Sequence, residues 1–572
     1  MNLDKKTIVK FNVLAIICII MFSFVVSPVT LQNDTYYTIK IGEHIVNNGI
    51  DMKDPFSWHE DLPYTYPHWL YDLGVYLIYN LGQSTGIADG GVIFIGISTA
   101  ILSCTLGVLI YITCSKLSKN NLISFILTFL IMYFIKDFVA ARAQLVTFNL
   151  FVLTILFIEM FLQNKKKRYL IGIVIISFLI ANIHVAVWPF FFVLFMPYIA
   201  AYIIACLIEK NVISKLIILD KKMNVKDLEK KLAKQKDDQK KIKIEEKLQL
   251  AKQKLAETEA NEAKIIAKAE ERRKNPFKII IKKNDATKWL IITMIICVFT
   301  GLLTPLGDTP YTYLIKTMQG NTMKNISEHL PLTLFNDVDT MVMLALVLAI
   351  LILTDTKVKL EDLFMMGGLI FLSFMSRRQV SMFMIIGLPI FIKWVTDLAT
   401  KYDKRGTEQV VNFMTSLIGK VVTICIVSFI CIYFVKAKMD LKIIDETKYP
   451  VQASDWILEN LDVENIKLYN EYNYGSYLLY RDIPVFIDSR ADLYAPEFNK
   501  TEEYKNGRNI FTDYINISSL GTYYENKFKD YGITHLIMGN NSKLNMFISR
   551  DDNYKQIYKD DYFVIYERLK NE

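Results

Sequence analysis

The chain has 572 residues, of which 52% are hydrophobic and 22% are charged, and its formal net charge is +8. The hydrophobic share exceeds that of ordinary soluble folds and is concentrated in long apolar runs, which excludes a chain built only of water-soluble domains. All seven cysteines lie inside these runs. The polar segments therefore offer neither a disulfide framework nor a cysteine-based metal site. We expect a lipid bilayer, and no nucleic acid, as the partner of such a chain.

Apolar runs that approach the ~20 residues needed to cross a bilayer recur along most of the chain. They predict a polytopic α-helical membrane protein of about eleven spans. No small-residue cleavage site follows the first run, so we interpret it as an uncleaved anchor. The predicted spans are residues 11–28, 91–114, 122–134, 145–162, 169–188, 189–207, 289–306, 341–354, 363–375, 380–394 and 418–435.

Charge predicts the orientation, because short cytoplasmic loops collect Lys and Arg. Residues 209–288 contain 24 Lys or Arg against 14 Asp or Glu, a net charge of +10, and fall on the same side as the N-terminus. Residues 438–572 contain 17 against 23, a net charge of −6, and fall on the opposite side. We therefore predict a multi-pass protein of the cell membrane, with a cytoplasmic N-terminus and an extracytoplasmic C-terminal domain.

Four parts follow from this topology. They are a first membrane part with an outer loop (1–208, loop 29–90), a cytoplasmic basic insertion (209–288), a second membrane part (289–436) and a C-terminal domain (437–572). The insertion is dominated by Lys, Glu, Gln and Ala, which predicts a helix or a helical hairpin. We interpret it as a solvated spacer; a basic face on anionic lipid and a coiled-coil contact remain alternatives.

Helix and strand signals alternate in the C-terminal domain, which predicts a small α/β fold. The predicted helices are 453–461, 474–480 and 520–531, and the predicted strands are 466–469, 485–488, 534–538, 555–558 and 562–568.

Ionisable residues gather at the predicted outer face and are sparse inside the spans. Glu159 and Lys393 lie near the inner ends of their spans and are expected to reach water by snorkelling. Five of the six histidines, with Asp34, Arg142 and the Arg377-Arg378 pair, lie at the predicted outer membrane interface. Because lipid makes such groups costly, their gathering at one interface predicts a site framed by the outer loop.

Several short motifs resemble one family. They are Asp34-Thr35 followed by Gly42-Glu43, Asp54-Pro-Phe-Ser57, His68-Trp-Leu70, Arg142-x-Gln-Leu145, Asn182-x-His184, Ser376-Arg-Arg378, Tyr474-Gly-Ser-Tyr-Leu478 and Phe486-Ile-Asp-Ser-Arg-Ala-Asp-Leu-Tyr494. In this order they resemble an uncharacterised bacterial branch of the C-type (GT-C) glycosyltransferase superfamily. The resemblance covers nearly the whole chain except the basic insertion.

The resemblance implies transfer of a sugar from a polyprenyl-phosphate donor to an acceptor on the outer face. In that superfamily a carboxylate after the first span activates the acceptor hydroxyl or binds a divalent metal, and Asp34 occupies that place. Arg142, Arg377 and Arg378 are the candidate phosphate ligands. His68 and His184 complete the predicted substrate-binding set. The chain lacks the adjacent acidic doublet of better-known members, so the metal stays unassigned. The sequence names neither the sugar nor the acceptor.

Each site residue also has a plainer interpretation. Asp34 fits a helix N-cap, His184 a packing histidine, and Arg377-Arg378 an anchor to lipid headgroups. Asp488, Arg490 and Asp492 likewise fit an internal salt-bridge cluster of the C-terminal domain.

The function has an alternative as well. A non-catalytic membrane scaffold or a transporter for envelope assembly is the alternative to an enzyme, because a family resemblance can outlast catalytic activity. A transporter is expected to show broken helices and buried polar residues near the midplane.

Overall fold

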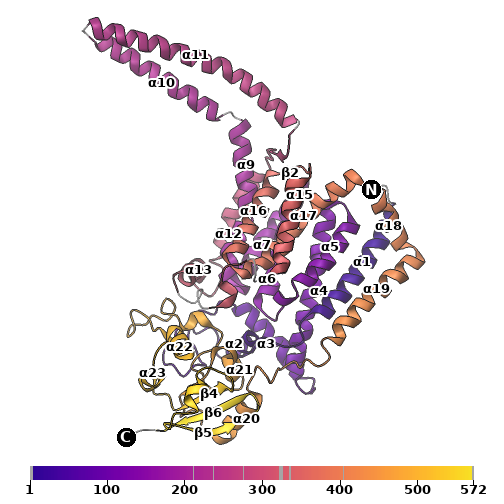
Figure 1. Ribbon diagram of the computed structural model, residues 1–572, viewed down its shortest axis with the longest axis vertical. Coiled ribbons are helices and arrows are strands. Elements are labelled where there is room, and N and C mark those ends of the chain that lie inside the picture. Colours follow the sequence, from indigo (N-terminus) through magenta and orange to yellow (C-terminus); the bar gives the residue numbers. More distant parts are fainter. Residues whose placement is uncertain are drawn as a thin grey trace.

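A bundle of apolar helices forms the centre of the molecule, with a long helical hairpin at one end and the C-terminal domain at the other (Figure 1). This computed structural model describes residues 4–209, 212–235, 238–274, 276–320, 326–333, 337–403 and 405–569. The remaining residues, which include 1–3 and 570–572, lie outside the described residues.

The central bundle has the length and apolarity of a membrane domain. Within the part of the chain that the structure describes, six helical segments are long and apolar enough to cross a membrane: α1 (Lys5–Val26), α4 (Gly90–Ser118), α6 (Ala143–Asn164), Val185–Glu209, Arg377–Tyr402 and α19 (Leu417–Lys436). Four shorter apolar helices are α5 (Asn121–Phe134), α7 (Arg168–Ile183), α12 (Thr287–Thr300) and α15 (Val338–Leu353). Each predicted span coincides with one of these helices or with α16 (Leu360–Met375). The count of eleven spans stays a prediction.

Two of the long segments are composite. Val185–Glu209 comprises η2 (Val185–Val187), α8 (Trp188–Val193) and α9 (Met196–Glu209), and Arg377–Tyr402 comprises η4 (Arg377–Gln379) and α17 (Val380–Tyr402). Shorter elements of the same region are η1 (Lys136–Phe138), α13 (Thr309–Gln319), η3 (Ser327–His329) and α18 (Gly406–Thr415).

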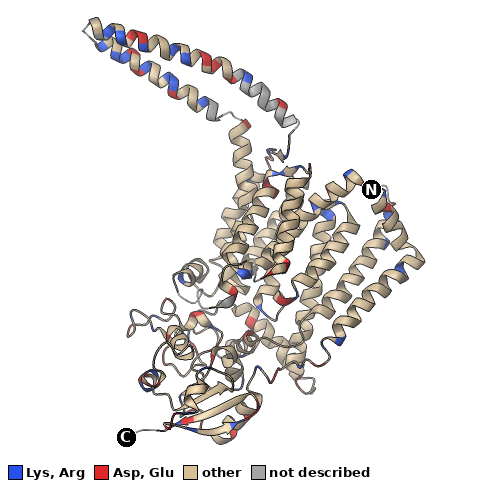
Figure 2. Cartoon of the chain, viewed as in Figure 1, with Lys and Arg blue, Asp and Glu red and all other residues tan. Residues whose placement is uncertain are grey.

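The basic insertion forms a helical hairpin, as predicted. Helices α10 (Val212–Lys234) and α11 (Asp238–Lys274) lie side by side and extend away from the bundle (Figure 1). Charges of both signs line the hairpin (Figure 2). Lys222 pairs with Glu259 at 2.9 Å and Lys252 with Glu229 at 2.7 Å, so ion pairs join the two helices. Short strands β1 (Ile279–Ile280) and β2 (Val358–Lys359) pair in parallel at its base.

A cluster of three charged side chains is buried inside the bundle. Lys393 of α17 donates to Glu159 of α6 at 3.3 Å and to Asp362 of α16 at 3.1 Å. Tyr198 of α9 also donates to Glu159, at 3.1 Å. The three charged side chains are only 14%, 8% and 6% exposed. The predicted snorkelling of Glu159 and Lys393 is therefore wrong, because the surrounding helices enclose both groups and the charges satisfy one another instead of water.

The outer loop and the C-terminal domain share one hydrophobic core. The loop contributes α2 (Asn33–Asn48) and α3 (Trp69–Gln83). The domain has a four-stranded sheet in the order β3 (Leu468–Tyr469), β4 (His535–Gly539), β6 (Phe563–Arg568), β5 (Tyr554–Lys559), in which β3 and β4 are parallel and the other pairs antiparallel. Its helices are α20 (Val451–Asn460), α21 (Tyr472–Tyr480), η5 (Ala491–Tyr494), α22 (Ile510–Ser518), α23 (Tyr524–Tyr531) and α24 (Asn545–Ile548).

One predicted strand does not join this sheet. The segment 485–488 forms a single parallel bridge, between Val485 and Ser57 of the outer loop. The backbone N–H of Trp58 donates to the Val485 carbonyl, and the N–H of Val485 to the Phe56 carbonyl, both at 3.3 Å. The outer loop therefore packs onto the C-terminal domain through backbone as well as side-chain contacts.

Candidate functional site

A cavity of about 710 Å³ lies where the helix bundle meets the C-terminal domain. Its polar walls come from the outer loop, the ends of bundle helices and the C-terminal domain. Its apolar walls come from the bundle helices. They include Phe151, Phe190, Val193, Leu194, Pro197, Ala200, Phe364, Met365, Leu369 and Leu372.

The apolar part owes some of its width to a glycine of α16. Gly368 lines the cavity, and a Cβ atom placed there would meet no other atom within 4 Å. Gly367 also has open space at its Cβ position but is not among the lining residues.

Five of the six predicted site residues line this cavity: Asp34, His68, Arg142, His184 and Arg378. They come from four distant regions of the chain, which the fold brings to one end of the bundle. Arg377 is not among the lining residues, and its backbone N–H donates to the Leu330 carbonyl at 3.0 Å.

Asp34 and Arg142 form the first part of the site. Asp34 lies in the first turn of α2, whose N-cap position is Gln32, so the N-cap interpretation of Asp34 is wrong. Its carboxylate lies 2.9 Å from Nε of Arg142, the residue that precedes α6. Nη1 of the same arginine lies 3.4 Å from Glu328. Burial alone would raise the pKa of Glu328, but Arg142 and Arg378 outweigh it and hold that pKa below its ordinary value.

Arg378 is the second cation of the site. Its Nη2 donates to the Gln144 side-chain carbonyl at 3.5 Å. In the described parts of the chain, no carboxylate lies within ion-pair distance of this guanidinium. Arg378 therefore keeps a charge that no described partner neutralises at close range. Gln144 was not predicted as a site residue, although it belongs to the Arg142-x-Gln-Leu145 motif.

His68 and His184 face each other, with ring centroids 4.9 Å apart. Nδ1 of His184 lies 3.0 Å from the Thr147 hydroxyl. Burial, followed by the charges of Arg378 and Arg142, lowers the pKa of His68 to about 3. Burial also lowers the pKa of His184 well below its ordinary value. Both rings are thus neutral at pH 7 and offer hydrogen bonds rather than charge.

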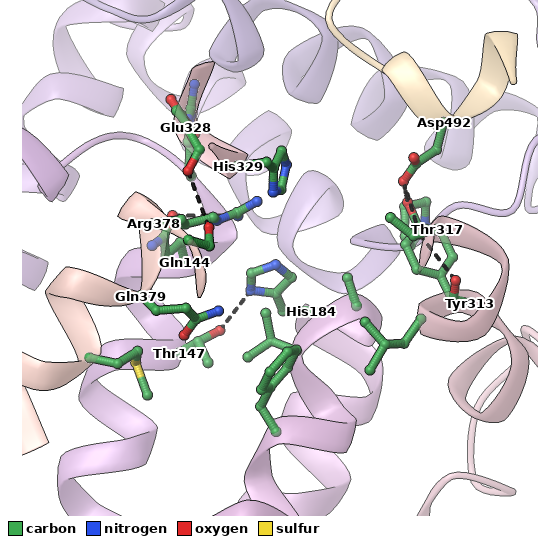
Figure 3. Close-up of a pocket in the computed structure, with 18 of the residues that line it drawn as sticks. Gln144, Thr147, His184, Tyr313, Thr317, Glu328, His329, Arg378, Gln379 and Asp492 are labelled. Atoms are coloured by element: carbon green, nitrogen blue, oxygen red, sulfur yellow. Dashed lines mark hydrogen bonds and ion pairs between the residues drawn. The ribbon is translucent and has the colours of Figure 1, made fainter. Parts of the chain in front are cut away.

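A second polar group lies across the cavity from Arg378 (Figure 3). Asp492 accepts hydrogen bonds from the Tyr313 hydroxyl at 2.7 Å and from the Thr317 hydroxyl at 3.4 Å. Tyr313 and Thr317 belong to α13, and sequence reasoning did not single them out. Tyr and Thr hydroxyls are common in a helix at a membrane interface, so no sequence signal distinguishes these two residues. Only their proximity to Asp492 identifies them as part of the site.

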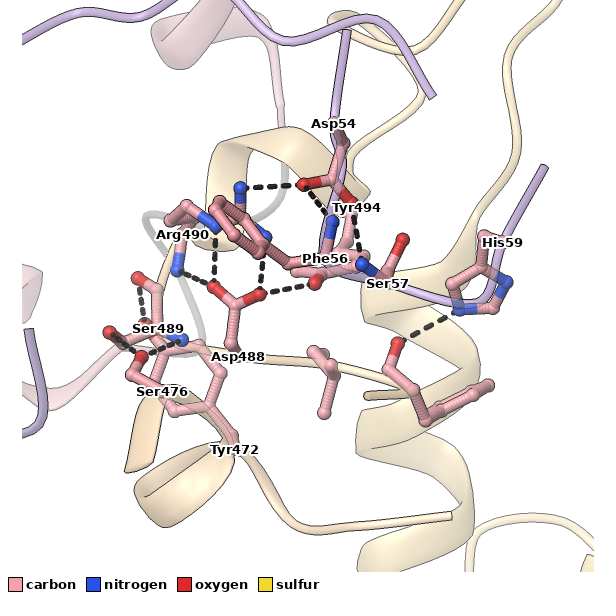
Figure 4. A network of polar contacts seen from close by, with 12 residues as sticks. Asp54, Phe56, Ser57, His59, Tyr472, Ser476, Asp488, Ser489, Arg490 and Tyr494 are labelled. Carbon is pink, nitrogen blue, oxygen red and sulfur yellow. Dashed lines mark hydrogen bonds and ion pairs between the residues drawn. The ribbon is translucent and has the colours of Figure 1, made fainter. Parts of the chain in front are cut away.

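A buried network fixes the outer loop to the C-terminal domain (Figure 4). Arg490 donates to Asp54 at 2.7 Å and makes two side-chain hydrogen bonds to Asp488, at 2.9 and 2.7 Å. The Tyr494 hydroxyl donates to Asp488 at 2.5 Å. Arg490 is 3% exposed, and both carboxylates are fully buried. The predicted internal cluster is therefore right for Asp488 and Arg490, but it extends to the outer loop. Asp492 instead accepts the hydrogen bonds from Tyr313 and Thr317 of α13, and among the described residues it makes no ion pair with Arg490.

No ready metal site is seen in this part of the molecule. Among the described residues, no three His, Cys, Asp or Glu side chains are grouped so that they could hold a metal ion.

Neither a scan against protein-family models nor a search of curated proteins finds a match to this chain.

His59 of the outer loop makes the docking of loop on domain sensitive to acid. Its Nε2 lies 2.8 Å from the Phe486 carbonyl, and burial lowers its pKa to about 4 from an ordinary 6.5. Between pH 4 and 6.5 the unfolded chain therefore binds more protons than the folded chain does. The stability that the folded protein has above pH 6.5 is lost as the pH falls toward 4. We expect this histidine to account for about 2.5 kcal/mol of the stability lost between pH 7 and 4.5. Thermal unfolding of wild type and His59→Gln over this range measures it; equal pH slopes would contradict the assignment.

Proposed function

We propose that this chain is a membrane glycosyltransferase that transfers a sugar from a polyprenyl-phosphate donor to an acceptor outside the cytoplasm. One observation carries the proposal: a single cavity joins the guanidinium of Arg378 to an apolar channel between bundle helices. A phosphate with a long hydrocarbon tail is the ligand that needs both features, because guanidinium binds phosphate through charge-assisted hydrogen bonds. Each buried CH₂ of the tail contributes roughly 0.8 kcal/mol.

The reaction assigns a role to each polar group. The acceptor hydroxyl gives its proton to the carboxylate of Asp34 while its oxygen bonds to the anomeric carbon of the sugar. The bond from that carbon to the phosphate oxygen breaks, and its electron pair stays on the phosphate. Arg378 and Arg142 stabilise the charge that grows there. The neutral rings of His68 and His184 can orient the sugar or the phosphate by hydrogen bonds.

The family resemblance supports the same function. Asp34, Arg142 and Arg378 belong to motifs that carry it, and all three line the cavity. A non-catalytic scaffold remains the second candidate, and the Asp34–Arg142 ion pair favours it, since a carboxylate held by arginine also serves a purely structural purpose.

The proposed function requires the C-terminal domain to be outside the cell and the basic hairpin inside. Asn541 of the domain and Gln249 of the hairpin are both exposed. With each replaced in turn by cysteine, a membrane-impermeant maleimide added to intact cells should label the cysteine at Asn541 and spare the one at Gln249. Both should react after the membrane is opened. The reverse pattern would contradict the orientation and the outer-face reaction.

Donor binding should depend on Arg378 and on the space beside Gly368. Arg378→Ala removes the cation and should weaken binding of farnesyl phosphate at least tenfold, the loss expected for one charge-assisted hydrogen bond. Gly368→Phe should fill the channel and weaken binding to a similar degree. The matched control is Gly367→Phe, which changes the neighbouring residue outside the cavity and should bind as the wild type does. Equal binding by all four proteins, measured by tryptophan fluorescence, would rule out this site for the donor.

Asp34→Asn should separate catalysis from binding. The substitution keeps the size of the side chain but removes the base, so transfer of labelled sugar in isolated membranes should fall by at least ~10²-fold. Farnesyl phosphate binding should survive. If transfer is unchanged in this variant, Asp34 is not the base and the scaffold becomes the better assignment for its ion pair.

A further inference from the structure

We infer that the cavity holds a second subsite, formed by Asp492, Tyr313, Thr317 and Asn33, that binds a neutral, hydroxyl-rich part of the acceptor. The inference rests on the proposed function and deepens it, because it names the chemical class of acceptor. Its residues come from the C-terminal domain, α13 and the start of α2, not from the motif residues assigned to the donor.

The two polar groups of the cavity are spatially distinct. Figure 3 shows Arg378, Gln144, Glu328 and His329 together on one side and Asp492, Tyr313 and Thr317 on the other. Both groups line the same cavity. A donor phosphate held at Arg378 therefore leaves the Asp492 side for the second substrate.

The second group is rich in hydrogen-bond acceptors. The carboxylate of Asp492 is only partly buried and lines the cavity. Asn33 lines it as well, and its side-chain amide donates to the Tyr472 carbonyl at 3.1 Å. The hydroxyl oxygens of Tyr313 and Thr317 can accept hydrogen bonds in addition to the carboxylate. A ligand with several hydroxyls can donate to this group.

The charges on this side argue against an anionic acceptor. Arg490 lines the cavity, but Asp54 and Asp488 already neutralise it. Among the described lining residues the other cationic side chains are Arg142 and Arg378, which belong to the donor group. An acidic acceptor would meet the negative charge of the Asp492 carboxylate, which lines the cavity.

Aromatic rings complete the subsite. Tyr313 and Phe498 lie with ring centroids 5.0 Å apart, and both line the cavity together with Tyr64. Aromatic faces stack against the C–H faces of a sugar ring, while carboxylate and amide oxygens accept its hydroxyls. A neutral carbohydrate matches this combination better than a hydrophobic or a phosphorylated acceptor.

The inference is tested on the full chain in detergent, by saturation-transfer NMR with methyl α-D-glucoside, methyl α-D-mannoside and methyl N-acetyl-β-D-glucosaminide. At least one of these uncharged probes should bind, and methyl β-D-glucuronide should bind roughly tenfold more weakly than the uncharged probes. Asp492→Asn keeps an oxygen for Tyr313 but loses the charge, and should weaken glycoside binding about tenfold. Tyr313→Phe should also weaken glycoside binding.

The matched control is Asp513→Asn. Asp513 also accepts a tyrosine hydroxyl, that of Tyr531 at 2.8 Å, but it is not among the residues that line the cavity. This variant should bind the glycosides as the wild type does, and Arg378→Ala should also retain glycoside binding while losing farnesyl phosphate. Unfolding temperatures verify that each variant is folded.

The outcomes separate the two proposals. If farnesyl phosphate binds through Arg378 but no uncharged glycoside binds, or if Asp492→Asn binds them normally, the subsite is wrong and the donor site stands. If glycosides bind through Asp492 but farnesyl phosphate does not bind, the subsite stands as a carbohydrate site and the proposed donor is wrong. If the glucuronide binds as well as the uncharged probes, the neutral class is overturned.

Discussion

The buried contact of Arg490 with Asp488 and Asp54 determines where the outer loop lies, and the position of Asp34 depends on that loop. Three charges are almost fully enclosed here, which is tolerable only because every group is paired. Removing one partner would leave an uncompensated buried charge, at a typical cost of roughly 3–5 kcal/mol. The loop is further held by backbone bonds between residues 56–58 and Val485. Helix α2 lies between the first span and this anchored segment of the outer loop. The position of the Asp34 carboxylate is therefore constrained on both sides along the chain.

Two glycines of the family-like motifs have a structural explanation in the same region. A Cβ atom at Gly42 would lie 2.2 Å from the Asp72 carbonyl, so only glycine lets α2 approach α3 this closely. A Cβ atom at Gly475 would lie 2.0 Å from the Ile487 carbonyl, which brings α21 against the segment that carries Asp488 and Arg490. These motif residues thus support the site by close packing, whereas Asp34, Arg142 and Arg378 line the cavity itself.

Sequence reasoning could predict the elements whose signal is local. The apolar helices, the basic hairpin and the final β5–β6 pair depend on composition and on short turn signals, and all are present. The segment 485–488 reads as a strand because it is apolar, yet its partner is Ser57 of the outer loop, which no local pattern reveals. Likewise Lys393 looks free to snorkel until α6 and α16 place Glu159 and Asp362 beside it.

The candidate site shows the same limit. Charge and predicted topology placed Asp34, Arg142 and Arg378 on one face, but an arginine doublet cannot say which member faces a cavity. In a 3-10 turn successive side chains point in different directions, and here Arg378 lines the cavity whereas Arg377 does not. The contact of Asp492 with Tyr313 could not be predicted from the sequence, because it forms only where α13 meets the C-terminal domain.

The pairing in the resting cavity also bears on how the proposed reaction would begin. Arg142 is shared between Asp34 and Glu328, the two histidines are neutral, and Arg378 has no described carboxylate at ion-pair distance. An incoming phosphate is therefore attracted first to Arg378. Once bound, it competes with Asp34 for Arg142, because a phosphate oxygen is an equally good partner for guanidinium. The Asp34 carboxylate would then be released from the arginine and could accept the proton of the acceptor hydroxyl.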